Sequence, residues 1–317
     1  MTDQHGLPDI LVLMPVYNGA AFLAEQLDSI LGQSHRNFLL LARDDGSSDH
    51  SVQILQAYAG KFPDRISLIH DSLGNLGASA SFGLLLQHAL TLIDNRPASP
   101  PCYVALADQD DWWHADKLAC CLQRMKQLEA TSATIPALVH SDLRVVDKAG
   151  QLLAPSLAAY QMLRVQHTGF VAQLVSNTLT GCTALMNTAL VRKALPIPAE
   201  AVMHDWWLSL VASAFGHRYF EPSALVDYRQ HGGNTLGARA ASRSGFRFRR
   251  LQTLLANNDT QDASELFRTL AVQAVCFDQR YGAEVGPARR WALRRVAALK
   301  HASALVRRLS FRLLRRL

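Results

Sequence analysis

The stretch YVALADQDDWW, residues 103–113, decides the fold of this chain. An apolar run ends there in three carboxylates within four positions, Asp108, Asp110 and Asp111. This pattern is typical of a buried parallel strand whose carboxyl end opens into the ligand crevice of an α/β sheet. Because repulsion and burial disfavour three ionised carboxylates so close together, we expect a divalent cation among them, and oxygen ligands suit Mg2+ or Mn2+. The simpler alternative is an acidic, solvated start of the amphipathic run 117–128.

Three further apolar segments end in polar turns and are followed by helical patterns: residues 10–14, 37–42 and 66–70. Repeated alternation of strand and helix predicts an α/β fold with a mostly parallel central sheet flanked by helices. The carboxyl ends of such strands meet at one edge of the sheet. We therefore expect one crevice to be lined by Asp44, Asp45, Asp108 and Asp110.

The second half of the chain is less regular. Residues 137–146 and 223–227 are expected as strands, and residues 151–175 are ambiguous. A turn of small residues around Gly181 enters another apolar segment.

The segment His204-Asp205-Trp206-Trp207 opens a helical run that continues to residue 215. In one interpretation Asp205 caps the helix and the two tryptophans fill the core. In the other, a carboxylate against aromatic surface has a raised pKa suited to a general base, and the aromatic faces stack on sugar rings. The sequence alone leaves both interpretations open.

The composition indicates a globular protein of one large or two modest domains, since 49% of its 317 residues are hydrophobic. Residues 1–9 lack a basic segment and the apolar run 10–16 is too short for a signal peptide or a membrane span. The five cysteines have no metal-binding or disulfide spacing, which predicts reduced core thiols in a cytosolic protein.

The net charge of +6 is unevenly distributed. Residues 240–317 hold 16 basic and 5 acidic residues, so residues 1–239 hold 16 basic and 21 acidic ones. From Trp291 onward a helical projection gathers Val296, Leu299 and Leu305 on one side, with arginines on the other. We expect this amphipathic basic helix to bind an anionic membrane surface, and the alternative is packing of its apolar side on the preceding domain.

Six motifs follow one another along the chain: Pro15-Val16-Tyr17-Asn18, residues 44–49 (DDGSSD), 75–77 (NLG), 108–111 (DQDD), 204–207 (HDWW) and 228–231 (YRQH). In this order they resemble the family 2 glycosyltransferases, inverting enzymes of the GT-A fold that use nucleotide-sugar donors. The resemblance covers about residues 8–238. It implies a GT-A domain at 1–238 and a C-terminal helical basic extension at 239–317.

The resemblance also implies roles for individual residues. The nucleotide sugar would be bound by Pro15, Tyr17, Asn18, Asp45, Gly77, Asp108 and Arg229. Asp110 and His231 would hold Mg2+ or Mn2+, Asp205 would be the catalytic base, and the acceptor would meet Gly181, Trp206 and Trp207. Many relatives have Glu-Asp where this chain has His204-Asp205, which leaves the role of His204 open.

The motifs look most like those of bacterial rhamnosyltransferases of cell-surface polysaccharide synthesis. The implied donor is dTDP-L-rhamnose, and the implied acceptor is a saccharide or a lipid-linked saccharide. The enzyme would then work in the cytoplasm, peripherally associated with the inner face of the plasma membrane.

Two other functions are weighed against this one. A sugar-nucleotide nucleotidyltransferase would need a glycine-rich loop with basic residues after the first strand, and residues 14–21 contain no basic residue. A nucleic-acid-binding protein would need a basic core with aromatics among its arginines, whereas residues 1–239 are net acidic. We therefore expect no nucleic acid partner.

Overall fold

The computed structural model describes residues 8–95, 101–130, 132–231 and 260–301. Its first half alternates strands and helices: β1 (Ile10–Val16), α1 (Leu23–Leu31), β2 (Phe38–Asp44), α2 (Ser51–Lys61), β3 (Ile66–Ile69), α3 (Ala78–Asp94) and β4 (Tyr103–Leu106). The neighbours β3, β2, β1 and β4 pair in parallel, with Leu11 opposite both Leu39 and Val104. The predicted strand and helix alternation is confirmed.

The second half contains β5 (Trp112–Trp113), α4 (Lys117–Leu128), β6 (Ala137–Val146), β7 (Leu152–Ala154), α5 (Leu157–Tyr160), α6 (Phe170–Val175), the 3-10 turn η1 (Gly181–Thr183), β8 (Ala184–Asn187), α7 (Thr188–Ala194), α8 (His204–Phe215) and β9 (His217–Arg229). The ambiguous stretch 151–175 thus holds one short strand and two short helices. The strand expected at 223–227 is the end of the longer β9.

The sheet has nine strands in the order β3-β2-β1-β4-β8-β6-β9-β5, and β7 pairs with β6 at the side. The predicted parallel arrangement holds from β3 to β4, after which β8 runs antiparallel to both β4 and β6. The fold is the expected α/β type, but its second half is a mixed sheet. This reversal brings the turn before β8, which contains Gly181, to the carboxyl end of β4.

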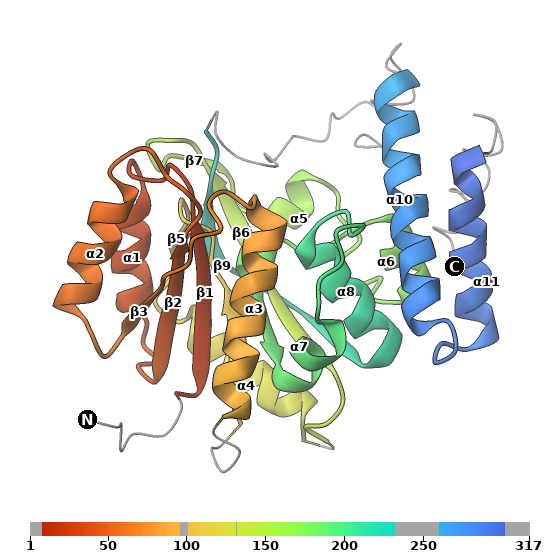
Figure 1. Ribbon diagram of the computed structural model, residues 1–317, viewed down its shortest axis with the longest axis horizontal. Coiled ribbons are helices and arrows are strands. Elements are labelled where there is room, and N and C mark those ends of the chain that lie inside the picture. Colours follow the sequence, from red (N-terminus) through yellow and green to blue (C-terminus); the bar gives the residue numbers. More distant parts are fainter. Residues whose placement is uncertain (1–7, 96–100, 131, 232–259, 302–317) are drawn as a thin grey trace.

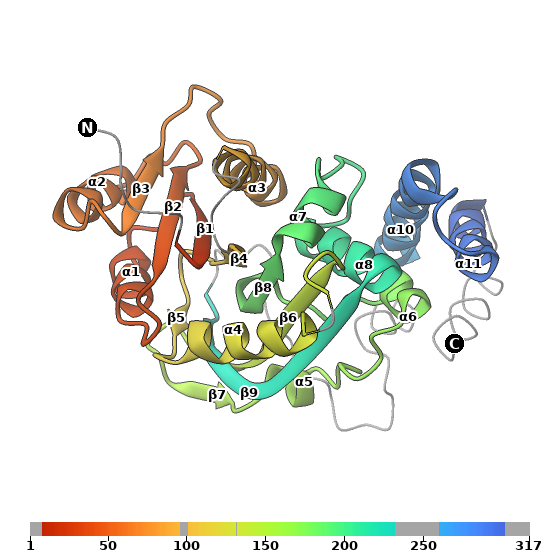
Figure 2. The ribbon, with the colours of Figure 1, turned by 90° about the horizontal axis from the view of Figure 1, so that it is seen from below.

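Helices cover both faces of the sheet (Figure 2). One core packs α3, α7 and α8 against alternate residues of the strands, such as Leu11 and Leu13. The other packs α1 and α4 against the intervening residues, such as Ile10 and Val12. Because both faces are covered, β1 is apolar along its whole length and almost completely buried.

The C-terminal helices α10 (Thr260–Tyr281) and α11 (Pro287–Ala298), followed by the 3-10 turn η2 (Leu299–His301), lie side by side at one end of the molecule, next to α6 and α8 (Figure 1). Phe277 of α10 packs against Trp207 of α8, with ring centroids 5.3 Å apart. Leu293 and Val296 of α11 have no exposed surface. Residues from both sides of the expected boundary at 238 therefore share one core.

This packing corrects one expectation about the tail. The amphipathic pattern places Val296 and Leu299 in the acyl boundary of a membrane, but both are buried within the protein. The remaining aliphatic positions of that predicted face, including Leu305, lie outside the described residues. Along residues 287–300 the side chains that face solvent are instead mostly basic, with Trp291 among them at 43% exposure.

Two further expectations, about membrane-spanning segments and about the cysteines, can be compared with the described residues. None of the helices within the described ranges combines the length and the apolar character that a membrane crossing requires. All five cysteines are free thiols, and Cys102, Cys121 and Cys182 are buried. The prediction of reduced thiols is thus consistent with the structure.

Candidate active site

A cavity of about 470 Å³ opens at the carboxyl ends of β1, β2 and β4, between the beginnings of α3 and α8. Its wall includes these residues from the predicted site: Pro15, Tyr17, Asp45, Gly77, Asp108, Asp110, Gly181 and Asp205. Six segments that are far apart in the sequence thus contribute to one crevice. The position of the crevice follows from the parallel half of the sheet, as predicted.

Asp45 anchors the loop that begins α3. Its carboxylate accepts hydrogen bonds from the backbone N–H groups of Leu76 (2.8 Å) and Gly77 (2.9 Å), and it pairs with the buried guanidinium of Arg43. Burial raises the pKa of Asp45, but these hydrogen bonds and one from Ser81 outweigh it and lower the pKa. Gly77 has a φ of +76°, which explains the glycine there. The Asp45 side chain is therefore ionised and held in a fixed position on the wall of the cavity.

The loop after β1 is held by side-chain hydrogen bonds rather than by regular structure. The amide of Gln109 accepts from the Tyr17 backbone N–H (2.7 Å) and donates to the Tyr17 carbonyl (2.9 Å). Asn18, at a φ of +48°, accepts from the Ser48 backbone N–H (2.8 Å). Tyr17 lines the cavity with 49% of its surface exposed, whereas Asn18 joins two loops and is not among the lining residues.

The three carboxylates after β4 crowd the floor of the site. Asp111 is completely buried, and its carboxyl group meets the Cys182 thiol and the Arg229 backbone N–H. Burial, followed by the charges of Asp110 and Asp205, raises the pKa of Asp108 to about 7. Burial and the charges of Asp108 and Asp110 raise the pKa of Asp111 well above its usual value. Burial and mutual repulsion thus favour protonation of Asp108 and Asp111 unless a cation lies among the carboxylates.

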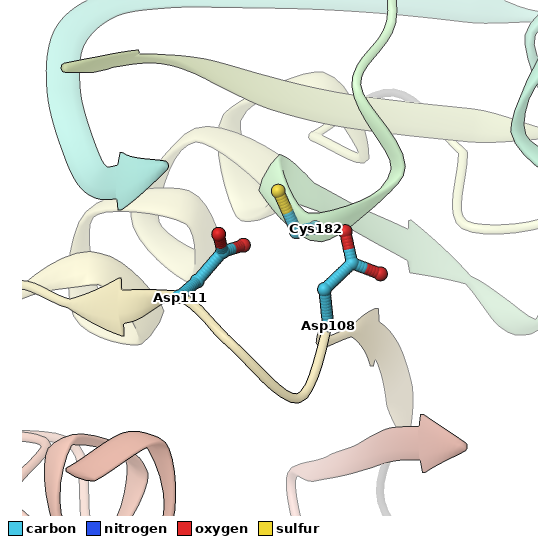
Figure 3. A group of neighbouring side chains, drawn as sticks. All are labelled: Asp108, Asp111 and Cys182. Carbon is cyan, nitrogen blue, oxygen red and sulfur yellow. The ribbon is translucent and has the colours of Figure 1, made fainter. Parts of the chain in front are cut away.

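Cys182 of η1 meets two of these carboxylates. One ligand atom each from Asp108, Asp111 and Cys182 lie within 4.8 Å of one another, and Figure 3 shows the three side chains converging. Burial, followed by the charges of Asp111 and Asp108, raises the pKa of the Cys182 thiol. A neutral thiol is a poor ligand for a hard cation, so this trio does not by itself define a magnesium site.

Asp110 and His231 lie together, as the sequence predicted. Oδ2 of Asp110 is 2.7 Å from Nε2 of His231, although the two residues are 121 positions apart. The His231 ring packs on Phe22, with centroids 4.8 Å apart. A carboxylate and an imidazole beside a crowded acidic floor fit Mn2+ well and Mg2+ through the oxygens.

Arg229 occupies a different place from the one expected of a nucleotide-sugar ligand. Its guanidinium is 2.6 Å from the Glu25 carboxylate of α1 and stacks over Phe22. It also donates to the Lys148 carbonyl, and it is not among the residues that line the cavity. In this structure Arg229 ties the end of β9 to α1, next to His231.

Asp205 lies in the first turn of α8 and, like Asp45, lines the cavity. Its Oδ1 accepts the backbone N–H of Trp206 at 2.6 Å. Gly181 passes close by, because a Cβ atom there would lie 3.4 Å from Cβ of Asp205 and 3.2 Å from Nε2 of His204. A side chain at position 181 would therefore press on the start of α8.

The two tryptophans do not face the cavity. Trp207 is completely buried, and its indole N–H donates to the Ala194 carbonyl at 2.9 Å. Trp206 donates its indole N–H to the Gln173 carbonyl at 2.6 Å and packs against the same core. For the expected acceptor-binding tryptophans, the structure thus favours the core-filling interpretation.

Several residues that shape the site were not among those predicted from the sequence. Arg43 is 1% exposed and joins Asp45 to Asp71, and Gln26 donates to the Asp108 carbonyl at 2.7 Å. Phe82 and residues 177–180 also line the cavity. A basic residue at the end of an apolar strand was the one available clue to Arg43.

The fold and the site together define an enzyme of the GT-A class. The sequence model of the Glycosyl transferase family 2 matches residues 11–194, which is more than half of the chain. The chain belongs to this family, so of the three functions weighed from the sequence the glycosyltransferase is the one supported.

Two relatives illustrate the similarity. TuaG of Bacillus subtilis strain 168, assigned as a teichuronic acid biosynthesis glycosyltransferase, is 28% identical over 253 residues, covering 78% of this chain and 90% of TuaG. The dTDP-rhamnosyl transferase RfbG of Shigella flexneri is 23% identical over 242 residues, covering 74% of this chain and 77% of RfbG.

Solved structures share the fold. TarS residues 1–349 of S. aureus, in complex with UDP-GlcNAc, superposes with a TM-score of 0.58 at 15% identity, over 92% of this chain and 71% of TarS. The mannosyltransferase PcManGT of Pyrobaculum calidifontis, in complex with GDP-Man and Mn2+, superposes with a TM-score of 0.53 at 19% identity. The superposition covers 95% of this chain and 78% of the PcManGT chain. The GT-A expectation is confirmed.

Proposed function

We propose that this protein is an inverting glycosyltransferase that moves a sugar from a nucleotide-sugar donor to a saccharide or lipid-linked saccharide in cell-surface polysaccharide synthesis. The observation that carries the proposal is the cavity that Asp45, Gly77, Asp110 and Asp205 line together, with His231 2.7 Å from Asp110. The names of TuaG and of the complexes of TarS and PcManGT support a polysaccharide product and a nucleotide-sugar donor.

Different parts of the cavity bind different parts of the donor. The nucleoside lies against Pro15, Tyr17 and the rigid Asp45 wall. Asp110 and His231 would hold Mg2+ or Mn2+, with Asp108 beside them, and the cation would offset the charge that develops on the nucleoside diphosphate leaving group. PcManGT, which shares the fold, was solved with Mn2+.

Asp205 takes the proton from the acceptor hydroxyl as that oxygen attacks the anomeric carbon. The attack comes from the face opposite the leaving group, so one displacement inverts the anomeric centre. Asp205 is suited to this role because it lines the cavity and its position is fixed by the first turn of α8.

We further propose L-rhamnose, supplied as dTDP-L-rhamnose, as the transferred sugar. The support is the residue pattern of the segments 108–111, 204–207 and 228–234, together with the similarity to RfbG. Residues 232–234, at the end of the third segment, lie outside the described residues.

A donor panel tests these proposals directly. The purified protein is incubated with Mn2+ and dTDP-L-rhamnose, UDP-glucose, UDP-GlcNAc or GDP-mannose, and release of the nucleoside diphosphate is measured. We expect turnover with dTDP-L-rhamnose to exceed that of the others by at least about tenfold, since unmatched buried polar groups are costly. A different preferred sugar would replace the rhamnose proposal, and release from none of an extended panel would contradict the function itself.

We also propose that the basic surface of α11 holds the enzyme on the anionic inner face of the plasma membrane. Arg294 and Arg295 are exposed, and the Arg295 guanidinium lies 5.1 Å from the centre of the exposed Trp291 ring. Because the aliphatic side of α11 is buried, attraction between charges replaces insertion as the mechanism. The arginines of residues 302–317 lie outside the described residues.

The membrane proposal predicts the effect of removing charge without disturbing the core. Each basic residue contributes roughly 1 kcal/mol near anionic lipid, so Arg294→Gln with Arg295→Gln should weaken binding to phosphatidylserine-containing liposomes by roughly 30-fold. The matched control is Arg192→Gln with Arg268→Gln, which removes two exposed arginines elsewhere. Co-sedimentation measures liposome binding by the two double variants, and equal binding would rule out α11 as the anchor.

A further inference from the structure

His204 is a buried polar residue on the cavity wall that the proposed chemistry does not use. It is the first residue of α8, lines the cavity and is only 4% exposed. Neither of its ring nitrogens has a hydrogen-bond partner among the described residues. Two unpaired polar atoms at a buried position destabilise the protein unless a ligand meets them.

The ring of His204 is held in one orientation. It stacks on Phe82 of α3, with centroids 4.1 Å apart and planes 23° apart. On the other side Gly181 lies close, because a Cβ atom at that position would be 3.2 Å from Nε2. The imidazole is therefore clamped between two walls of the cavity, and its orientation is set before any ligand arrives.

Burial lowers the pKa of His204 to about 3, so the imidazole is neutral at physiological pH. A neutral imidazole offers one N–H donor and one nitrogen acceptor. A sugar hydroxyl also both donates and accepts, and it brings no charge into a buried site. A carboxylate would offer acceptors only, and its charge would have no partner on this ring.

The position of His204 indicates which sugar it meets. Phe82, on which it stacks, lies on the helix whose first turn begins beside Gly77 and Asp45, at the proposed nucleoside end. The next residue along the chain is Asp205. His204 thus lies between the proposed nucleoside wall and the proposed base, which is where the transferred sugar of a donor would lie.

We propose that His204 binds a hydroxyl group of the transferred sugar and determines which neutral sugar the enzyme accepts. This inference rests on the proposed glycosyltransferase function. The imidazole selects hydroxyl position and configuration, while the nucleoside contacts are made elsewhere in the cavity. His204 is therefore a specificity-determining residue that acts on the sugar alone.

The test compares binding of an intact nucleotide sugar with binding of its nucleoside diphosphate. Calorimetry uses dTDP-L-rhamnose and dTDP, or the corresponding pair for whichever donor the panel selects. His204→Phe keeps the stack on Phe82 but removes both polar atoms, so we expect nucleotide-sugar affinity to fall about 10- to 100-fold while nucleoside diphosphate affinity changes less than about twofold. His204→Gln, which can donate and accept, should recover part of the loss.

The control is His217→Phe, which makes the same replacement at an exposed position. Equal losses for the sugar and the diphosphate ligands would overturn the inference in favour of a structural role, and so would unchanged affinity and donor preference in both His204 variants. If His204→Phe does not fold, the donor preference of His204→Gln decides. The donor panel with the wild-type protein separates the two proposals. If the wild type turns over a donor and the His204 variants behave like it, only this inference fails. If the wild type turns over no donor, the proposed function fails and the inference fails with it.

Discussion

Replacing Asp205 with Asn should reduce kcat by about 100- to 10,000-fold while leaving donor affinity nearly unchanged. The expected loss is that of a general base, and the group acts on the acceptor proton rather than on the nucleotide. The substitution should not disturb α8, because an Asn side-chain oxygen can still accept the Trp206 backbone N–H that Asp205 accepts at 2.6 Å. Steady-state kinetics and calorimetry with the donor measure the two effects.

The control for Asp205 is Asp64→Asn, which removes one carboxylate from an exposed loop. A variant of Asp205 that keeps wild-type kcat would show that another group takes the proton. A collapse of donor binding would instead assign Asp205 to the donor.

Asp110→Asn should reduce the rate of sugar transfer by about 100-fold or more, because it removes a charged ligand from the proposed cation site. Its unfolding temperature without metal should not fall, since Asp110 contributes to the repulsion that raises the pKa of Asp108. Titration with Mn2+ in the presence of the nucleoside diphosphate should show weakened binding. The three measurements together separate a lost ligand from a damaged fold.

Asp116→Asn is the matched control, because Asp116 is an exposed carboxylate on the same segment, six positions further along the chain. It should bind Mn2+ and turn over donor like the wild type. Full activity of Asp110→Asn, or of the wild type in excess chelator, would contradict a role for the cation.

The sequence predicts the parts of this fold that depend on local pattern. The apolar runs at residues 10–14 and 103–107 are short and end in polar turn residues, which favours buried strands, and the polar residues after them meet at one edge of the sheet. For the same reason the sequence alone assigns Asp44, Asp45, Asp108 and Asp110 to one crevice. The last three line the cavity, whereas Asp44 accepts hydrogen bonds from the backbone of its own turn and is not a lining residue. Asp205 follows only from the order of the motifs, since helix capping explains it equally well.

The sequence does not predict contacts that depend on pairing between distant segments. Arg229 meets Glu25 across 204 positions, and no local periodicity encodes that partnership. The direction of β8, and hence the placement of Gly181 beside α8, depends on which strands it joins. The amphipathic pattern of α11 correctly indicates a helix with one apolar side, but an apolar stripe does not reveal whether lipid or protein covers it.

The packing of Phe277 and Leu293 into the core beneath α8 bears on how this enzyme should be produced. A shortened chain ending near residue 238 would expose Trp207 and its neighbours, and each large apolar side chain returned to water costs roughly 1.5 to 3 kcal/mol. Such a fragment would be prone to aggregation, and its inactivity would say nothing about catalysis. Any shortened version made for expression should retain α10 and α11, because these helices support the helix that carries Asp205.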